Sequence, residues 1–203
     1  MRGHRAVMVV AGAAAVCCAA TLPVSAAPTA SAAAQAGTWG TAIKVPGLKA
    51  LNQGGAAELN SVSCGSAGNC VAVGRYLDGS FHAHAFLAGE RNGTWRRAID
   101  VPGSETLNAG GGATATSVSC ASSGNCAAGG YYRDGSGRFQ GFVVSKANGT
   151  WGNAIEIPGL ANLNAGGNAI VNSVSCGSAG NCAAGGSYKD GSGHIQAFVV
   201  SQA

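Results

Sequence analysis

The sequence predicts an all-β protein built from three copies of one four-stranded unit. The stretch 61–70, Ser-Val-Ser-Cys-Gly-Ser-Ala-Gly-Asn-Cys, returns with few changes at 117–126 and 173–182, each time 56 residues later. A fixed period of this kind is typical of repeat architectures, in which neighbouring units bury each other's apolar faces. The 34 glycines and a charged fraction of 10% suit short strands joined by tight turns. Nothing after residue 36 has the apolar spacing of a helix, so we expect strands alone.

The first 26 residues have the pattern of a secretory signal peptide. A basic start with Arg2 and Arg5 precedes an apolar run over 6–22, and the small residues Val-Ser-Ala follow at 24–26. A retained membrane anchor is disfavoured because this alanine-rich run of 17 residues is at the short limit for a span. We therefore expect a secreted, extracellular protein that has no membrane association after processing.

A spacer of alanine, serine, threonine and proline follows at 27–36, and it contains a second cleavage site at 30–32. Lipidation at Cys17 or Cys18 is disfavoured because the residues before them lack the pattern that a lipid-modified cysteine requires. The sequence does not decide between the two cleavage sites.

The repeat domain is expected at 37–203, with units at 37–92, 93–148 and 149–203. Each unit begins with Gly-Thr-Trp, and the second and third units are identical at 36 of 55 aligned positions. Since recent duplication alone leaves identical residues, identity between the units does not by itself indicate a functional role.

Turn residues divide each unit into four short strands. The first three strands of the third unit are expected at 170–175, 181–188 and 194–201. The fourth strand is of the 151–157 type and is entered through Asn148-Gly149, which, like Asp190-Gly191, is a strong hairpin signal because both residue types tolerate positive φ. A Pro-Gly pair ends this strand and begins a loop to the next unit. The sequence therefore predicts a meander of twelve strands.

Six cysteines follow the signal peptide, in three pairs with five residues between partners. In a secreted chain this spacing predicts three local disulfides that fix hairpin register, each contributing about 2–3 kcal/mol. A zinc site is disfavoured because zinc ligand pairs are closer in sequence and no histidine accompanies each pair. The expected bridges are Cys64 to Cys70, Cys120 to Cys126 and Cys176 to Cys182.

Over 37–203 the chain resembles the Ser-Val-Ser-Cys…Asn-Cys repeats of secreted actinobacterial proteins. The segment His82-Ala-His-Ala-Phe86 is similar to the extracellular HAF repeat, although Gln140-Gly-Phe and Gln196-Ala-Phe replace it in the other units. The glycine-rich strand followed by Asn-Gly-Thr-Trp also resembles a blade of BNR or Asp-box propellers, whose box is incomplete here.

The resemblance implies propeller-like blades of four strands. Closed propellers usually have four to eight blades and exposed sheet edges are a liability, so three blades are expected to close by pairing two chains into a six-bladed ring. The alternative is a monomer with three-fold symmetry, a β-prism or a β-trefoil. Light scattering distinguishes the two, because a dimer supports the ring.

Aromatic residues recur once per unit. We expect the tryptophans and phenylalanines to lie mainly in the core, whereas the tyrosines keep a polar end and are candidates to stack on a sugar. The candidate tyrosines are Tyr76, Tyr132 and Tyr188.

Two further groups of polar residues are candidates for ligand binding. A hydrogen-bond donor follows the Asp-Gly turn of each unit, and a Leu-Asn-x-Gly-Gly loop places an asparagine beside glycine backbone at one face of any ring. Alternatively, the donors lie at solvated strand ends and the loops are simply crossover turns, without a role in binding. The candidates are His82, Arg138 and His194, and Asn52, Asn108 and Asn164.

Several functions are disfavoured. Without Arg2 and Arg5, ten basic residues face eight acidic ones, too small an excess to indicate nucleic acid binding. The turn carboxylates Asp78, Asp134 and Asp190 supply one ligand each where calcium takes six to eight oxygens. No nucleophile with a base and no carboxylate pair for glycoside hydrolysis is visible. We expect a non-enzymatic protein without metal or cofactor.

The sequence thus favours a secreted protein that binds carbohydrate or another surface polymer through three weak copies of one site, which gain by avidity. The alternative is a structural or protein-interaction module of the cell surface with no small ligand. A polysaccharide pull-down competed by free sugar distinguishes these hypotheses.

Overall fold

The computed structural model describes residues 37–202, so the signal peptide and spacer expected at 1–36 lie outside the described residues. Within the described residues, those from Ala42 onward form one compact unit, and residues 37–41 are assigned to another. The strands of the compact unit are β1 (Ala57–Ser66), β2 (Asn69–Leu77), β3 (Ala83–Arg91), β4 (Thr94–Trp95), β5 (Ile99–Asp100), β6 (Thr114–Ser122), β7 (Asn125–Arg133), β8 (Phe139–Ala147), β9 (Thr150–Trp151), β10 (Ile155–Glu156), β11 (Ala169–Ser178), β12 (Asn181–Lys189) and β13 (Ile195–Ser201).

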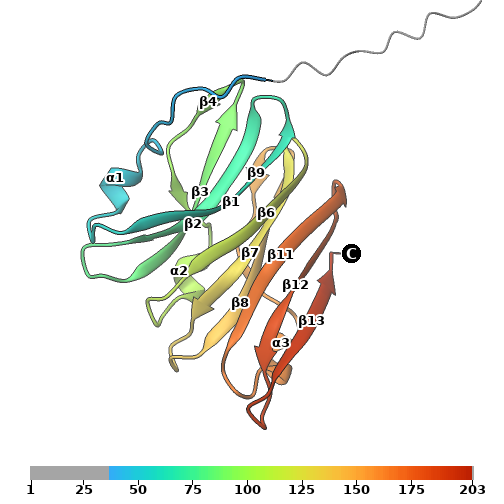
Figure 1. Cartoon of the computed structure of the whole chain (residues 1–203). Coiled ribbons are helices and arrows are strands. Elements are labelled where there is room, and N and C mark those ends of the chain that lie inside the picture. Colours follow the sequence, from blue (N-terminus) through green and yellow to red (C-terminus); the bar gives the residue numbers. More distant parts are fainter. Residues whose placement is uncertain (1–36, 203) are drawn as a thin grey trace, which may run out of the picture. The chain divides into compact units, whose positions relative to one another are not determined.

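The strands form three antiparallel sheets, which confirms the all-β prediction (Figure 1). Sheet one contains β1 to β5, sheet two contains β6 to β10, and sheet three contains only β11, β12 and β13. The expected fourth strand is wrong in detail: in the second and third units it is broken into two strands of two residues each, and in the first unit residues 37–45 form no strand. The short strands pair with the last long strand before them, so sheets one and two are each completed by the start of the next repeat.

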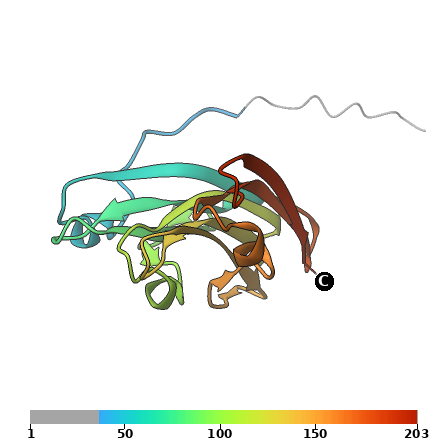
Figure 2. The same ribbon diagram turned by 90° about the horizontal axis from the view of Figure 1, so that it is seen from below.

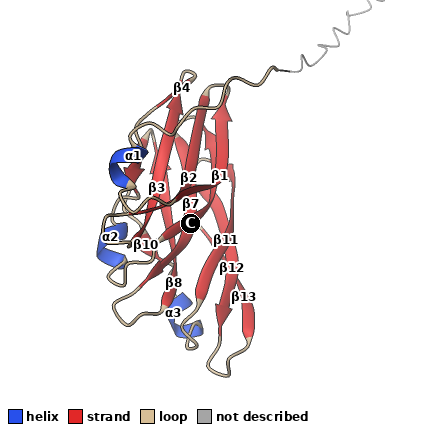
Figure 3. Cartoon of the chain, turned by 60° about the vertical axis from the view of Figure 1, so that its left-hand side comes forward, coloured by secondary structure: helices blue, strands red, loops and turns tan. Residues whose placement is uncertain are grey.

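The expectation that the chain has no helix is also wrong. Three single-turn helices follow the three Pro-Gly pairs, and Figure 3 shows them along one side of the sheets. Each begins after a glycine with φ between 75° and 78°, a conformation that favours glycine. They are too short to show an apolar period in the sequence. They are α1 (Leu48–Leu51), α2 (Ser104–Leu107) and α3 (Leu160–Leu163).

The sheets are held together by apolar clusters between their faces. One cluster joins sheets one and two and includes Leu87, Val118 and Phe142. A second joins sheets two and three and includes Val171 and Phe198. Strand β6 lies between β1 and β11, as the fan of sheets in Figure 2 also shows. The order of the sheets in space is therefore their order in the sequence.

A β-bulge recurs in the first strand of every sheet. The register of β6 against β7 shifts between Ala115 and Ser117, and the same shift occurs in β1 and β11. The bulge presses the Thr114 carbonyl against Gly130, where a Cβ would collide with it. The bulged residue Thr116 donates from its hydroxyl to the Val171 carbonyl of the next sheet. The bulge therefore leaves one residue of the strand outside the pairing within its sheet, and this residue contacts the next sheet instead.

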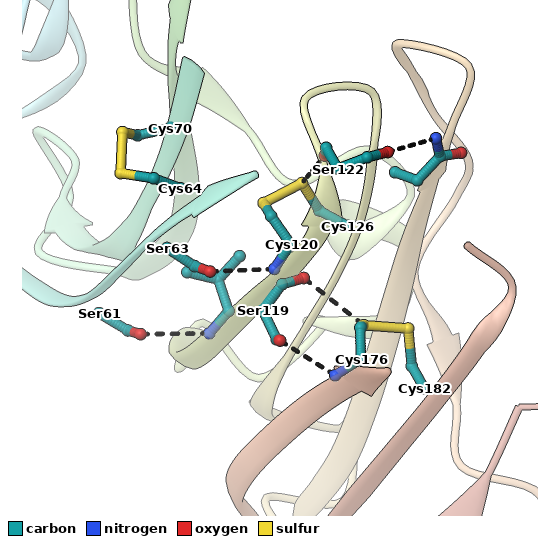
Figure 4. Close-up of a disulfide and its surroundings, with 12 residues drawn as sticks. Ser61, Ser63, Cys64, Cys70, Ser119, Cys120, Ser122, Cys126, Cys176 and Cys182 are labelled. Atoms are coloured by element: carbon teal, nitrogen blue, oxygen red, sulfur yellow. Dashed lines mark hydrogen bonds between the residues drawn. A yellow bond between two sulfur atoms is a disulfide. The ribbon is translucent and has the colours of Figure 1, made fainter. Parts of the chain in front are cut away.

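The three predicted disulfides are confirmed. Each joins the end of the first strand to the start of the second strand of its sheet, as Figure 4 shows. Three disulfides indicate that the chain folds in an oxidising environment, as extracellular proteins do. Over the described residues 37–202, no helix has the length and hydrophobicity needed to cross a bilayer.

Candidate functional site

The turns that join the second and third strands of each sheet lie at one end of the stack. We call the three turns 78–82, 134–138 and 190–194 the turn row; Figure 1 shows them at the lower ends of the sheets. In the first, the Asp78 Oδ1 accepts hydrogen bonds from the amides of Ser80 at 2.8 Å and His82 at 2.9 Å. Asp134 and Asp190 cap their turns in the same way.

The second carboxylate oxygen of each turn aspartate is also engaged. It accepts from His84 at 3.1 Å in sheet one and from Gln140 and Gln196 in the other sheets. The amide of His82 and the side chain of His84 hold the pKa of Asp78 below its usual value. These carboxylates are therefore ionised and committed to turn structure, which agrees with the predicted turn role.

Three of the predicted ligand-binding residues stand exposed on the turn row. The side chains of His82 and His194 are 61% and 73% exposed, and Arg138 occupies the equivalent position. The His82 ring lies against Gly111, and the Arg138 side chain lies against Gly167, both glycines of the next unit's loop. Both glycines have φ of +71° and leave no room for a Cβ. His82 and Arg138 thus each bridge two successive units.

The predicted asparagines lie at the same end of the sheets but face inward. Asn108 is 8% exposed and Asn164 is 1% exposed. The Asn108 amide donates to the Ala83 carbonyl of the preceding sheet, and its oxygen accepts from the Gly112 amide. Asn164 makes the equivalent bonds to Phe139 and Asn168. These two asparagines join neighbouring units and do not reach a ligand at the surface.

Asn52 differs from its two equivalents. Its Oδ1 is the one buried side-chain nitrogen or oxygen without a hydrogen-bond partner within the described part of the chain. Asn52 also lines an open hollow of about 300 Å³ with Lys44, Val45, Leu48 and Lys49 on the outer face of sheet one. The equivalent oxygens of Asn108 and Asn164 accept from the amide four residues later. The Nδ2 groups of Asn108 and Asn164 donate to a carbonyl of the preceding sheet, and among the described residues no sheet precedes sheet one.

Two of the predicted tyrosines are buried. Tyr76 is 4% exposed and donates to Asp100 at 2.7 Å, and Tyr132 is 3% exposed and donates to Glu156 at 2.9 Å. Burial, reinforced by these hydrogen bonds, raises the pKa of both hydroxyls. The prediction that they stack on a sugar is corrected here, because neither ring face is open to a ligand. Tyr188 is half-buried.

The tryptophans do not behave alike. Trp95 and Trp151 are half-buried and pack against apolar clusters, which agrees with the core expectation. Trp39, in the separate N-terminal unit, is fully exposed, so the core expectation is wrong for it in this structure.

A cavity of about 330 Å³ lies between sheets two and three. Val174, Cys182 and Val200 line it from sheet three, and Val143, Ile155 and Pro158 line it from sheet two. The lining is apolar, and none of the described residues that form it is aromatic. The cavity differs chemically from the turn row, since it offers few polar groups to a sugar.

Sequence reasoning missed the role of the Ser-Val-Ser motif. The hydroxyl of Ser63 accepts from the Cys120 amide at 3.0 Å, and the hydroxyl of Ser119 accepts from the Cys176 amide at 3.0 Å (Figure 4). Ser61 and Ser117 accept from the next sheet in the same way. The alternation of two serines in a strand, repeated at each unit, was the available signal.

The described residues contain no cluster of three or more histidine, cysteine, aspartate or glutamate side chains arranged to hold a metal ion. What the turn row offers chemically is a line of exposed donors beside loop backbone, suited to oxygen-rich ligands. No known family model matches this chain, and no curated protein is significantly similar to it.

Proposed function

We propose that this protein is a secreted, non-enzymatic binding protein for carbohydrate or another oxygen-rich surface polymer, and that the turn row is its binding surface. Its three sheets are arranged as successive blades of a propeller-like stack. The polymer lies across His82, Arg138 and His194, which donate hydrogen bonds to its oxygens.

The observation that supports the proposal is the spacing of exposed donors on one end of the stack. His82 and Arg138 lie against glycines of the next unit's loop, and in all three turns the aspartate accepts a hydrogen bond from the donor's backbone amide. A row of equivalent sites matches a polymer with a repeating unit, because weak contacts to successive units add through effective concentration. The tyrosines take no part in this surface, because Tyr76 and Tyr132 are buried.

The proposal is tested by co-sedimentation with insoluble polysaccharides, with free oligosaccharide as competitor. The variant that combines His82→Ala, Arg138→Ala and His194→Ala is expected to lower apparent affinity at least ~10-fold, because three donors are lost from one multivalent surface. The matched control combines Arg91→Ala and Arg96→Ala, two exposed cations outside the turn row. Equal loss in the control points to general charge attraction and contradicts the proposal.

The second candidate function is a structural or protein-interaction module of the cell surface. The observation that favours it is the exposure of apolar residues on the first and last sheets, including Leu59 in sheet one and Val199 in sheet three. Failure of every polysaccharide to bind, with self-association intact, favours this candidate.

A further inference from the structure

Residues on the outer face of sheet one are exposed where their equivalents in the other sheets are buried. Leu59 is 43% exposed, whereas Ala115 and Val171, one and two units later, are 0% exposed. Val62 is 51% exposed, whereas Val118 is 5% exposed. Sheets two and three are covered on this face by the sheet before them. The outer face of sheet one is therefore the face onto which a preceding sheet would pack.

Sheet three, the last sheet of the stack, has an uncovered apolar face and lacks its outer strands. Val199 in sheet three is 89% exposed, whereas its equivalent Leu87 is 1% exposed under sheet two. Sheet three also lacks the short outer strands that complete the other two sheets. The edge of β13 therefore offers unpaired backbone groups, which sheets do not usually leave open.

The cavity between sheets two and three is the place where a tryptophan is missing. In sheet two, Trp151 packs against the cluster that contains Val118, Cys126 and Val144. The equivalents of these three residues, one unit later, line the cavity of about 330 Å³. They are Val174, Cys182 and Val200. The tryptophan that would fill the cavity belongs to a Gly-Thr-Trp segment that sheet three does not receive from its own unit.

The segment 37–45 has the sequence of the missing outer strand. It reads Gly-Thr-Trp-Gly-Thr-Ala-Ile-Lys-Val, against Gly-Thr-Trp-Gly-Asn-Ala-Ile-Glu-Ile at 149–157. Ile99 pairs with Leu87, and Ile155 pairs with Val143. By the same register Ile43 pairs with Val199 and Trp39 lies opposite Gln202, which lines the cavity.

The chain's own segment does not supply this strand. Val45 and Leu48 pack on the outer cluster of sheet one, and the Pro46 carbonyl accepts from the Ala98 amide. Ile43 is two residues from Val45, so it lies within about 7 Å of it. Sheet two stands between this anchor and sheet three.

We propose that the segment 37–45 of a second copy of this chain completes sheet three, with its Trp39 in the cavity between sheets two and three. The second copy's sheet one then packs on Val199, and the exchange is reciprocal, which closes two chains into a ring of six sheets. Propellers of six blades lie within the usual range. The inference does not depend on the proposed ligand.

Polar groups at the two ends also match. Ser173 and Ser175 are exposed, and their equivalents accept hydrogen bonds from the amides of the next sheet. In the pair they accept from the amides of Val62 and Cys64 of the second copy. The Asn52 side-chain amide is brought beside the Ile195 carbonyl, so that its Nδ2 donates to the equivalent of the carbonyls that Asn108 and Asn164 bind.

Light scattering of the purified chain, at concentrations up to ~100 µM, tests the proposal. A dimer is expected, and Trp39→Ala or Val199→Asp is expected to raise its Kd at least ~50-fold, because each removes apolar contact from the interface. Both side chains are exposed within one chain, so neither change affects folding of the monomer. Phe81→Gly is the matched control: Phe81 is 72% exposed, and glycine stands at both equivalent positions.

A monomer throughout this range, an open-ended series of oligomers, or a dimer that Trp39→Ala leaves intact would overturn the closed pair. Failure of the unmodified dimer to bind any polysaccharide overturns the proposed function alone, so the two failures are distinguishable.

Mixing two variants that each carry one added cysteine tests the register. Directly paired residues of antiparallel strands have Cα atoms about 4.5–5.5 Å apart, which is within disulfide range. Ile43→Cys mixed with Val199→Cys is expected to give a covalent dimer on mild oxidation. Ile43→Cys mixed with Ile195→Cys, four residues out of register on the same strand, is the control. Equal cross-linking in both mixtures contradicts the proposed pairing.

Discussion

At the scale of single residues, serine hydroxyls do the work that backbone pairing does within a sheet. Ser63 and Ser119 each accept one amide of the next sheet, in a partly buried environment. A hydroxyl suits this role because it is short and accepts a bond while its own proton turns elsewhere. The strands of neighbouring sheets are thereby held in register without joining one ladder.

Ser119→Ala is expected to lower the free energy of unfolding by about 1–3 kcal/mol, because it leaves the amide of Cys176 without an acceptor. Urea unfolding followed by circular dichroism measures the change. Ser123→Ala is the matched control, since Ser123 is exposed and alanine stands at both equivalent positions. Equal loss of stability in both variants would show that the hydroxyl bond contributes nothing.

The buried tyrosines make stability depend on alkaline pH. An unfolded tyrosine titrates near pH 10, and the folded state raises the pKa of Tyr76 and Tyr132 above that value. Their contribution is therefore complete below about pH 10 and is lost as the pH rises toward the folded pKa. We expect the free energy of unfolding to fall above about pH 10, and less steeply in Tyr132→Phe. If the free energy of unfolding falls equally steeply with pH in Tyr132→Phe, the loss of stability comes from groups other than this tyrosine.

The tyrosine and asparagine predictions failed for a common reason. Sequence alone showed that Tyr76 and Asn108 recur with the unit, but not which side of the strand or loop faces the neighbouring sheet. Tyr76 faces inward because its hydroxyl has Asp100 to bind, a partner contributed by the next repeat. Asn108 faces inward because the carbonyl of Ala83 in the preceding sheet needs a donor.

At the scale of elements, local sequence signals were sufficient for the long strands and the disulfides. The positions of the long strands followed from turn residues, and the disulfides followed from the five-residue spacing within each cysteine pair. The short helices and the broken fourth strand did not follow, because four-residue helices and two-residue strands carry no period. Trp95 and Ile99 belong to separate strands, since the chain leaves the sheet between them.

Each disulfide is expected to contribute about 2 kcal/mol, because closing a loop of so few residues removes little entropy from the unfolded chain. Two double variants are compared. The first combines Cys64→Ala and Cys70→Ala, and the second combines Cys120→Ala and Cys126→Ala. The central pair is expected to cost more, since Cys126 is 4% exposed and lies in the cluster between sheets one and two, whereas Cys64 is exposed. Denaturant unfolding measures both, and equal costs would contradict the packing contribution.

At the scale of the whole molecule, the boundaries of the sheets do not coincide with the boundaries of the sequence repeats. Each repeat begins with the outer strand of the sheet before it, so Thr94–Trp95 completes sheet one and Thr150–Trp151 completes sheet two. This offset joins neighbouring units by backbone pairing as well as by side-chain packing. It also means that any finite number of repeats has one strand too many at its start and one too few at its end.

The offset was present in the sequence, but its consequence was not visible there. The register of the Gly-Thr-Trp segments shows that the units repeat. The order of turns and strands along the sequence is the same whether a unit completes its own sheet or the one before it. Strand pairing decides this question, as the pairing of Ile99 with Leu87 and of Ile155 with Val143 shows.

Amide exchange distinguishes the two ends of the stack from its middle. In dilute protein the amides of Val62 and Cys64 are expected to exchange at least ~10-fold faster than those of Val118 and Cys120, because no serine of a preceding sheet accepts from them in the described chain. Raising the concentration until two copies pair is expected to slow exchange at Val62 and Cys64, while Val118 changes little. Hydrogen exchange followed by NMR measures all four amides at once. If Val62 and Cys64 exchange at the same rate across the concentrations at which mass doubles, the two copies meet through some other surface, and the surplus strand at the start of the chain needs a different partner.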